Sequence, residues 1–254
     1  MLDLLAFDLD GTLADTETLK AISYGWAAHV LRPDLDPAAV EAAYPAFVGR
    51  SREEIASGLT ERFDLAEAAA ARDGSVEPWE AYVALRLERY RALLADGALV
   101  RRYDLAPTVA LARRARALAR HTALVTTSDR RNARRVLGAL GLAGAFDVVV
   151  TSDDVARTKP DPEPYRLALQ RLGVAAAAAL AVEDSPAGIR GALAAGLRVL
   201  AVPSDYTRAS VRAMVEEGTL QGSEVVAPEA LAAAVEARAA GATAGLSAGR
   251  RPER

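Results

Sequence analysis

The amino-acid sequence predicts an α/β protein, with a doubly wound (Rossmann-like) parallel sheet as its core and an inserted all-helical cap domain. Short apolar runs that end in polar or acidic residues alternate with alanine- and leucine-rich segments of helical spacing, as parallel βαβ units require. One long stretch, residues 17–103, interrupts this alternation because it is rich in helix formers and contains no convincing strand. The alternation predicts the sheet, and the interruption predicts the second domain.

Five apolar runs are the expected strands of the sheet. They cover residues 2–8, 122–127, 146–151, 179–183 and 198–202. Helical spacing between the later runs predicts helices over residues 132–140, 164–172 and 187–195. A further strand is expected over residues 225–227, near the C-terminus.

The interruption divides the chain into a core of residues 1–16 and 104–240 and a helical cap of residues 17–103. Pro33, Pro37, Pro45 and Pro78 stand at expected helix boundaries within the cap. Because the cap begins just after the first strand, it should lie as a lid over the carboxyl end of the sheet, where open α/β folds bind ligands. Residues 241–254 are mostly Gly, Ala, Ser and Arg without an apolar period, so we expect a poorly ordered tail there.

Composition excludes several classes of function. The chain has 254 residues, 51% of them apolar and 26% charged, which is the balance of an ordinary globular protein. It has no cysteine, so disulfides, thiolate metal sites and a cysteine nucleophile are excluded. The net charge of -3 and the dispersed arginines disfavour a nucleic-acid partner. Acidic residues in the N-terminal segment, such as Asp3, disfavour a signal peptide or a membrane span, so a cytoplasmic protein without a membrane partner is expected.

The strongest local motif is FDLDGTL at residues 7–13. Its two carboxylates, Asp8 and Asp10, follow an apolar strand, and Gly11 allows a sharp turn directly after them. At a strand end the two acids can share a divalent cation, which offsets their repulsion and keeps Asp8 ionised as a nucleophile. The heptapeptide alone is also compatible with a solvated Asp-Gly turn.

Three further motifs follow later strands. Thr126 and Thr127 offer hydroxyl and N–H groups at the start of a helix, which suits a phosphate, although helix capping explains them equally. Lys159 lies in a proline-stiffened loop, and Glu183 and Asp184 end the fourth strand. A lysine supplies a fixed cation for phosphate oxygens, and a carboxylate completes the oxygen ligand set that Mg²⁺ prefers. Each residue alone fits a surface or capping role, but their joint placement at strand ends favours one site.

These four motifs, in this order, resemble those of the haloacid dehalogenase-like hydrolase superfamily over residues 2–203. The cap is similar to that of its branch of β-phosphoglucomutase, sugar-phosphate and phosphoglycolate phosphatases. The resemblance implies that Asp8 is the nucleophile, forming an aspartyl-phosphate, and that Asp10 protonates the leaving oxygen and then activates water. It implies that Thr126, Thr127 and Lys159 hold the phosphoryl group, that Asp8, the Asp10 carbonyl and Asp184 ligate Mg²⁺, and that Glu183 orients the metal's water shell.

The resemblance therefore implies a Mg²⁺-dependent phosphatase acting on a small phosphomonoester, such as a sugar phosphate or phosphoglycolate. Asp10 disfavours the dehalogenase branch, because a carbon–halogen substrate needs no acid for a phosphate leaving group. Phosphoryl transfer of the β-phosphoglucomutase kind is the alternative. A non-catalytic binding protein is disfavoured because every matched catalytic position is filled. No pattern selects between a monomer and a homodimer.

Two arginines are the candidate substrate contacts in the cap. Arg52 lies where the substrate-contacting arginine of the related branch falls, with Arg50 as a competing candidate, and Arg86 takes the position of a cap lysine in the mutase. Both Arg52 and Arg86 could bind anionic or hydroxylated substrate groups. The alternative is a solvated helix face with i,i+4 ion pairs. An arginine in place of the lysine favours phosphatase over mutase, because a planar fork and a point charge are not interchangeable.

Overall fold

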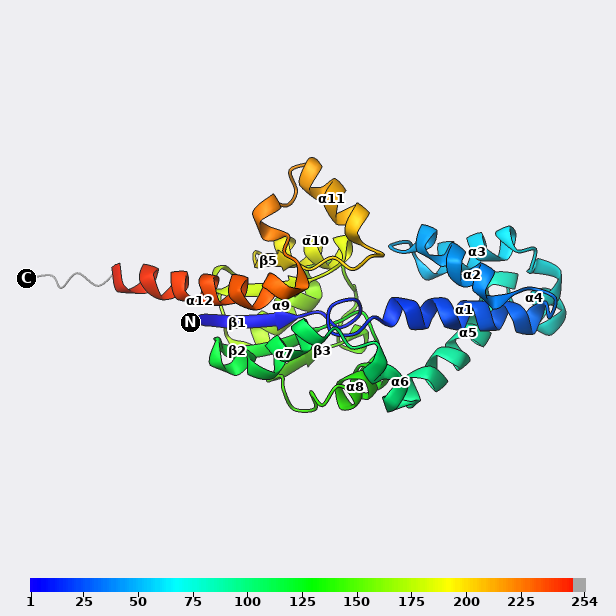
Figure 1. The fold of residues 1–254 in the computed structure, drawn as a ribbon, viewed down its shortest axis with the longest axis horizontal. Coiled ribbons are helices and arrows are strands. Elements are labelled where there is room, and N and C mark those ends of the chain that lie inside the picture. Colours follow the sequence, from blue (N-terminus) through cyan, green and yellow to red (C-terminus); the bar gives the residue numbers. More distant parts are fainter. Residues whose placement is uncertain (249–254) are drawn as a thin grey trace, which may run out of the picture.

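The computed structural model describes residues 1–248 and confirms the predicted fold class. Five parallel strands form one sheet in the order β3-β2-β1-β4-β5. The strands are β1 (Leu2–Phe7), β2 (Ala119–Val125), β3 (Val148–Val150), β4 (Ala179–Glu183) and β5 (Arg198–Ala201). Strand β1 lies at the centre of the sheet, between β2 and β4. Figure 1 shows β1 beside β2. Residues that follow these three strands therefore meet at one edge of the sheet.

Helices cover both faces of the sheet. One face packs against α7 (Ala106–Arg114), α8 (Arg130–Ala139) and α12 (Leu231–Ala248), and the other against α9 (Glu163–Leu172), α10 (Pro186–Ala194) and α11 (Arg208–Glu216). Leu5 and Phe7 belong to the first apolar cluster, whereas Leu4 and Ala6 belong to the second. Successive side chains of a strand point to opposite faces, so a strand covered on both sides reads as a continuous apolar run.

Residues 16–102, all of which the structure describes, are helical and contain no strand. The helices are α1 (Thr16–Leu31), α2 (Pro37–Ala43), α3 (Arg52–Arg62), α4 (Ala66–Arg72), α5 (Pro78–Ala95) and α6 (Gly97–Arg102), with a 3₁₀ turn at Tyr44–Phe47. Pro37 and Pro78 occupy the first turns of α2 and α5, where a missing N–H costs nothing. Tyr24, Tyr44 and Tyr82 anchor a separate apolar cluster, so this segment has its own core.

A hydrogen-bonded neck joins the cap to the core. The Leu105 N–H donates to the Leu13 carbonyl at 3.0 Å, and the Asp15 N–H donates to the Tyr103 carbonyl at 2.8 Å. An antiparallel bridge pairs Ala14 with Asp104 between these two bonds. The chain therefore leaves the core and returns to it at one place.

The C-terminal region differs from the sequence expectation in two ways. The expected strand at residues 225–227 is reduced to one bridge, between Ala201 and Val225, because Pro228 follows without an N–H and starts a 3₁₀ turn. Helix α12 runs to Ala248, past residue 241 where a poorly ordered tail was expected. Residues 249–254 of that tail lie outside the described residues.

Four further 3₁₀ turns connect these elements in the core, at Ala115–Ala117, Ser152–Asp154, Ala176–Ala178 and Gly222–Glu224. Within residues 1–248, the helices are too short or too polar for any of them to traverse a lipid bilayer.

Candidate active site

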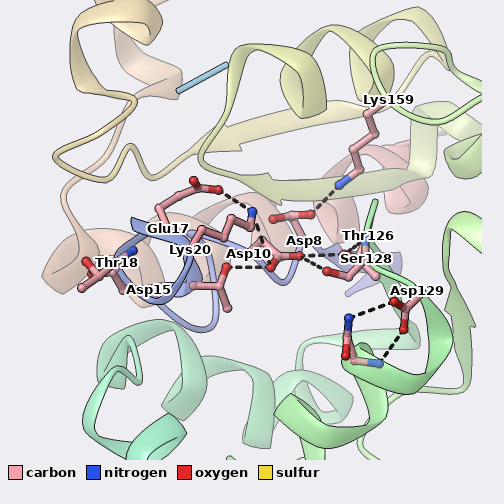
Figure 2. Close-up of polar contacts among 12 residues, drawn as sticks. Asp8, Asp10, Asp15, Glu17, Thr18, Lys20, Thr126, Ser128, Asp129 and Lys159 are labelled. Carbon is pink, nitrogen blue, oxygen red and sulfur yellow. Dashed lines mark hydrogen bonds and ion pairs between the residues drawn. The ribbon is translucent and has the colours of Figure 1, made fainter. Parts of the chain in front are cut away.

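The structure brings the polar residues at the strand ends together. Phe7 of β1 is paired with Leu124 of β2 and Val182 of β4, so the residues just after these positions are neighbours. The Asp8 N–H donates to the Val182 carbonyl at 3.0 Å, which fixes the backbone of Asp8 against β4. Figure 2 shows the side chains of Asp8, Asp10, Thr126 and Lys159 converging at this edge. The predicted core residues therefore surround one place in the fold.

Lys159 is buried at the centre of this group. Its Nζ donates to Asp8 Oδ1 at 2.6 Å, to Glu183 Oε1 at 2.6 Å and to the Val125 carbonyl at 2.7 Å. Burial by itself would lower the pKa of Lys159, but the charges of Asp8 and Glu183 outweigh it and raise that pKa. Lys159 is therefore a permanent cation whose three N–H groups tie the ends of β1, β2 and β4 together.

Tyr165 of α9 completes the surroundings of Lys159. Its hydroxyl donates to Glu183 Oε1, the same oxygen that accepts from Lys159, and the Lys159 Nζ lies 5.2 Å from the centre of its ring. Nothing in the sequence indicated Tyr165, because a buried aromatic on an amphipathic helix carries the same signal as any core residue.

Three buried carboxylates form an acidic cluster beside Lys159. Oxygen atoms of Asp8, Glu183 and Asp184 lie within 4.8 Å of one another. Burial and the charges of Glu183 and Asp10 raise the pKa of Asp8 to about 7, although Lys159 acts to lower it. Burial, with the charges of Asp8 and Glu183, raises the pKa of Asp184 well above its ordinary value. These carboxylates therefore repel one another more than one lysine can offset.

Two atoms of the acidic cluster have no hydrogen-bond partner among the described residues. They are Glu183 Oε2 and Asp184 Oδ1, and both are buried. A hard divalent cation satisfies unpaired carboxylate oxygens and removes their mutual repulsion. The donor set therefore fits Mg²⁺, with Asp8 and Asp184 among the carboxylates that would face it. The side chain of Asp10, in contrast, is not a member of the cluster.

Two glycines make room for the acidic cluster. Gly11 has a φ of 85°, and a Cβ there would lie 2.2 Å from Asp184 Oδ2. Gly188, in the first turn of α10, approaches Glu183 so closely that a Cβ would lie 1.9 Å from Oε2. Gly11 was predicted from its turn motif, whereas nothing in the sequence indicated a role for Gly188.

Asp10 lies outside the acidic cluster and accepts three hydroxyl hydrogen bonds (Figure 2). Thr16 Oγ1 donates at 2.6 Å, Ser128 Oγ at 2.8 Å and Thr126 Oγ1 at 3.1 Å. Lys20 Nζ lies 4.0 Å from Asp10 Oδ1. Burial would raise the pKa of Asp10, but the Lys20 charge and these hydrogen bonds lower it. Asp10 is thus stabilised as a carboxylate anion in this arrangement.

The two predicted threonines have different surroundings. Thr126 is buried, and its hydroxyl accepts from the Ser128 N–H at 3.0 Å while donating to Asp10. Thr127 is exposed, and no hydrogen bond of its side chain occurs in the described part of the chain. Ser128 belongs to the same run of hydroxyl residues that was expected to suit a phosphate. No sequence pattern indicated Thr16 or Lys20, whose hydroxyl and amine groups near a helix start are ordinary capping or surface features.

Arg86 of α5 is a buried cation in the cap. It is 6% exposed, and its guanidinium carbon lies 4.7 Å from the ring centre of Tyr24 and 5.2 Å from that of Tyr90. Its Nε and Nη1 are buried without a hydrogen-bond partner, and no ion pair of Arg86 occurs among the described residues. The alternative of a solvated helix face is therefore wrong for Arg86.

Arg52 is exposed, at the first position of α3, directly after the capping residue Ser51. It borders a surface hollow of about 520 Å³ that Trp79, Val83 and Leu87 also line. No described hydrogen bond or ion pair joins Arg52 to the strand-end residues, so the structure does not bring it into that group. Arg50 packs on Phe47, with its guanidinium carbon 5.4 Å from the ring centre.

The fold and the site define a class of protein. A doubly wound sheet with a helical cap, a paired Asp-x-Asp motif at the first strand end and a buried lysine are the parts of a capped α/β hydrolase. Residues 2–196 match the family described as haloacid dehalogenase-like hydrolase, and the chain belongs to this family. The predicted superfamily is therefore confirmed, and so is the prediction of an enzyme that hydrolyses phosphoric monoesters, at the level of class.

Similar proteins span most of the chain. The chain is 35% identical to Protein CbbY of Rhodobacter capsulatus over 217 residues, covering 80% of this chain and 86% of the relative. It is 34% identical to the phosphoglycolate phosphatase of Rhodospirillum rubrum, covering 82% of each. The crystal structure of CbbY from Rhodobacter sphaeroides in complex with xylulose-1,5-bisphosphate is 31% identical, with a TM-score of 0.58, covering 82% of this chain and 89% of that one.

Proposed function

We propose that the protein is a Mg²⁺-dependent phosphatase that hydrolyses a small phosphomonoester, of the sugar-phosphate or phosphoglycolate type, through an aspartyl-phosphate on Asp8. The observation that carries this proposal is the placement of Asp8 between the buried Lys159 cation and the unpaired carboxylate oxygens of Glu183 and Asp184. Relatives named CbbY and phosphoglycolate phosphatase support the substrate type. So does the xylulose-1,5-bisphosphate in the crystal structure of CbbY.

The chemistry assigned to the two aspartates follows from their positions. A carboxylate oxygen of Asp8 attacks phosphorus, the new P–O bond forms on Asp8, and the ester P–O bond breaks. Asp10 is an anion in the arrangement described above, so it has to take up a proton from solvent when the substrate binds, and it then gives that proton to the leaving oxygen. Asp10 then takes a proton from the water that attacks phosphorus, which releases inorganic phosphate and restores Asp8.

Charge compensation falls to the groups around Asp8. Lys159 holds a positive charge beside the reacting carboxylate, and Thr126 and Thr127 are proposed to hold phosphoryl oxygens at the start of α8. Mg²⁺, when bound by Asp8, Asp184 and the Asp10 carbonyl, would neutralise charge that develops on the phosphoryl oxygens. We propose that Glu183 orients the water shell of that ion.

The cap would contact the remainder of the substrate. Arg86 offers two N–H-bearing nitrogen atoms to an anionic or hydroxyl group of the substrate, because no acceptor among the described residues uses them. Arg52 is exposed on the cap surface and is proposed only as an outer contact. A cytoplasmic location and the absence of nucleic-acid and membrane partners stay predictions from the sequence.

Phosphate release from a substrate panel tests this function. The panel contains phosphoglycolate, sugar phosphates, a sugar bisphosphate and p-nitrophenyl phosphate, each with and without Mg²⁺. We expect Mg²⁺-dependent release that Asp8→Asn lowers by roughly 10⁴-fold or more, as for other nucleophile deletions. Asp3→Asn is the matched control, since Asp3 lies on the same strand without a described hydrogen bond or ion pair.

Two results would count against the phosphatase. Phosphate release that is unchanged in Asp8→Asn would rule out an aspartyl-phosphate on Asp8. Conversion of β-glucose 1-phosphate to glucose 6-phosphate without free phosphate, followed by ³¹P NMR, would replace hydrolysis with the mutase reaction.

A further inference from the structure

The loop between β5 and α11, residues 203–207, contacts both the cap and the acidic cluster. The residue just before it is anchored to β4, because the Val202 N–H donates to the Glu183 carbonyl at 2.7 Å. Its last two residues point to different partners: Thr207 bonds Asp184, and Tyr206 bonds Thr18 at the base of the cap. We call residues 203–207 the linking loop.

Thr207 fixes one oxygen of the Asp184 carboxylate. The buried Thr207 Oγ1 donates to Asp184 Oδ2 at 3.3 Å, and it accepts from the Ser204 N–H at 3.0 Å. A hydroxyl has one proton, and the Ser204 hydroxyl, 3.1 Å away, can donate its own, so the Thr207 proton is free for Asp184. With Oδ2 held in this way, Oδ1 is the buried atom of Asp184 that has no partner among the described residues, and Asp184 belongs to the acidic cluster.

Tyr206 binds the cap at two points. Its hydroxyl lies 3.0 Å from Thr18 Oγ1 in the first turn of α1, and Thr18 spends its own proton on Asp15, so Tyr206 donates. The Tyr206 ring also meets the ring of Tyr44, edge to face, with centroids 6.4 Å apart. It belongs to the core chain but packs against the apolar cluster of the cap.

The cap side of this contact leads on to Asp10. The Tyr44 hydroxyl donates to Glu17 Oε2 at 2.7 Å, and Lys20 donates to Glu17 Oε1 at 2.6 Å. Lys20 is the cation beside Asp10, and Figure 2 shows Glu17, Lys20 and Asp10 in sequence. The linking loop therefore touches Asp184 directly and touches, through Tyr206, the cap residues that surround Asp10.

We propose that Thr207 is a positioning residue for the cation site and that Tyr206 couples this site to the docking of the cap. When the cap is docked, Tyr206 holds the linking loop, and Thr207 holds Asp184 with Oδ1 turned to the ion. Coupling of this kind is reciprocal, so the cation must in turn favour the docked cap. The inference rests on the proposed metal site but not on the proposed substrate.

Binding of Mg²⁺ alone to the full chain, measured by calorimetry, tests the role of Thr207. We expect Thr207→Val to weaken the affinity for Mg²⁺ about 10-fold, as loss of a hydrogen bond to a metal ligand does. Thr207→Ser, which keeps the hydroxyl, should restore it. Thr60→Val is the matched control, because the buried Thr60 hydroxyl has no described partner. Melting temperatures in chelator establish that each variant is folded.

Tyr206→Phe tests the coupling, with a smaller expected effect of roughly 3-fold on Mg²⁺ affinity, the size of one hydrogen bond. Tyr103→Phe is its control, since the Tyr103 hydroxyl has no hydrogen-bond partner in the described part of the chain. The chain lacks cysteine, so two dyes can be placed without background at Glu67→Cys in the cap and Gln170→Cys in the core. Mg²⁺ should shorten the distance between the dyes in the parent protein and leave it unchanged with Tyr206→Leu.

Three outcomes would overturn the inference. They are unchanged Mg²⁺ affinity in Thr207→Val, a distance between the dyes that does not respond to Mg²⁺ in the parent protein, and a parent protein that does not bind Mg²⁺. None of these measurements uses a substrate, so an unsuccessful phosphate-release panel would count against the proposed function while leaving this result intact.

Discussion

Lys159 in the core and Arg86 in the cap are both buried cations, but their surroundings are opposite. Lys159 has three oxygen partners at 2.6–2.7 Å, two of them carboxylates. Arg86 lies between the rings of Tyr24 and Tyr90, with two nitrogen atoms unpaired. The core cation is part of a completed network, whereas the contacts described for the cap cation in residues 1–248 are with aromatic faces.

This difference separates polar groups whose hydrogen bonds are completed within the protein from polar groups whose hydrogen bonds a ligand would complete. A desolvated cation over an aromatic ring gains about 2 kcal/mol, which offsets only part of the cost of burying a charge. An anion brought to Arg86 would meet donors that have no competing protein acceptor. An anion brought near Lys159 has to share that cation with Asp8 and Glu183.

The largest expected effect comes from removing the core cation. Lys159→Met leaves Asp8 and Glu183 buried without a counter-charge, so the free energy of unfolding should fall by about 3–5 kcal/mol. The measurement is urea denaturation at pH 8 in chelator, where Mg²⁺ cannot compensate. Arg86→Met is the matched comparison: no ion-pair partner of Arg86 occurs among the described residues, so its loss leaves no buried carboxylate uncompensated and should lower the free energy of unfolding by less than Lys159→Met does.

Equal destabilisation by the two methionine variants would break the comparison. It would mean that some group stabilises Arg86 as much as the carboxylates of Asp8 and Glu183 stabilise Lys159. A rise in KM for the substrate in Arg86→Met, at unchanged stability, would instead sharpen it.

A smaller effect on stability is expected from a substitution that crowds the acidic cluster without removing a charge. In Gly188→Ala the new methyl group overlaps Glu183, so the free energy of unfolding should fall by about 1–3 kcal/mol. Affinity for Mg²⁺ should fall by about 10- to 100-fold, because the displaced carboxylate belongs to the acidic cluster. Gly138→Ala, in α8 with open space around it, should raise stability by about 0.8–1 kcal/mol. Equal behaviour of the two variants would show that Glu183 is not confined by Gly188.

The smallest expected effect is a pH dependence confined to the core. The raised pKa of Asp8, about 7, means that this carboxyl holds a proton below neutrality. A cation has to displace that proton, so Mg²⁺ affinity should rise about 10-fold from pH 6 to pH 8 and then level off. Calorimetry in two buffers of different ionisation enthalpy would measure the released proton. Constant affinity for Mg²⁺ from pH 6 to pH 8 would contradict the statement that burial and mutual repulsion raise the pKa of Asp8.

The sequence predicted that these core residues would lie together because strand ends converge. Asp8, Lys159, Glu183 and Asp184 follow apolar runs, and parallel strands place their carboxyl ends at one edge of a sheet. The order of the strands makes neighbours of residues that lie more than 150 positions apart in the chain. Periodicity and motif spacing therefore carried the fold and the core residues together.

Other features of the site could not be recognised from the sequence pattern. Thr16 looks like an ordinary helix cap, and Gly188 shows its purpose only when a Cβ is placed on it. Exposure separated Arg52 from Arg86, and exposure depends on how cap helices pack rather than on helical spacing. The expected strand at residues 225–227 is limited by Pro228. How far a proline shortens strand pairing depends on where the neighbouring strand lies, and the sequence does not give that position.

The hydrogen-bonded neck affects how the cap can be engineered and how it can change in evolution. The insertion leaves at Leu13–Asp15 and returns at Tyr103–Leu105, where the two segments bond each other and not the sheet interior. A segment whose ends are already adjacent can be exchanged with little change in loop-closure entropy. Cap grafting at this junction would transplant substrate preference onto unaltered phosphate chemistry, and lineages could diversify by the same route.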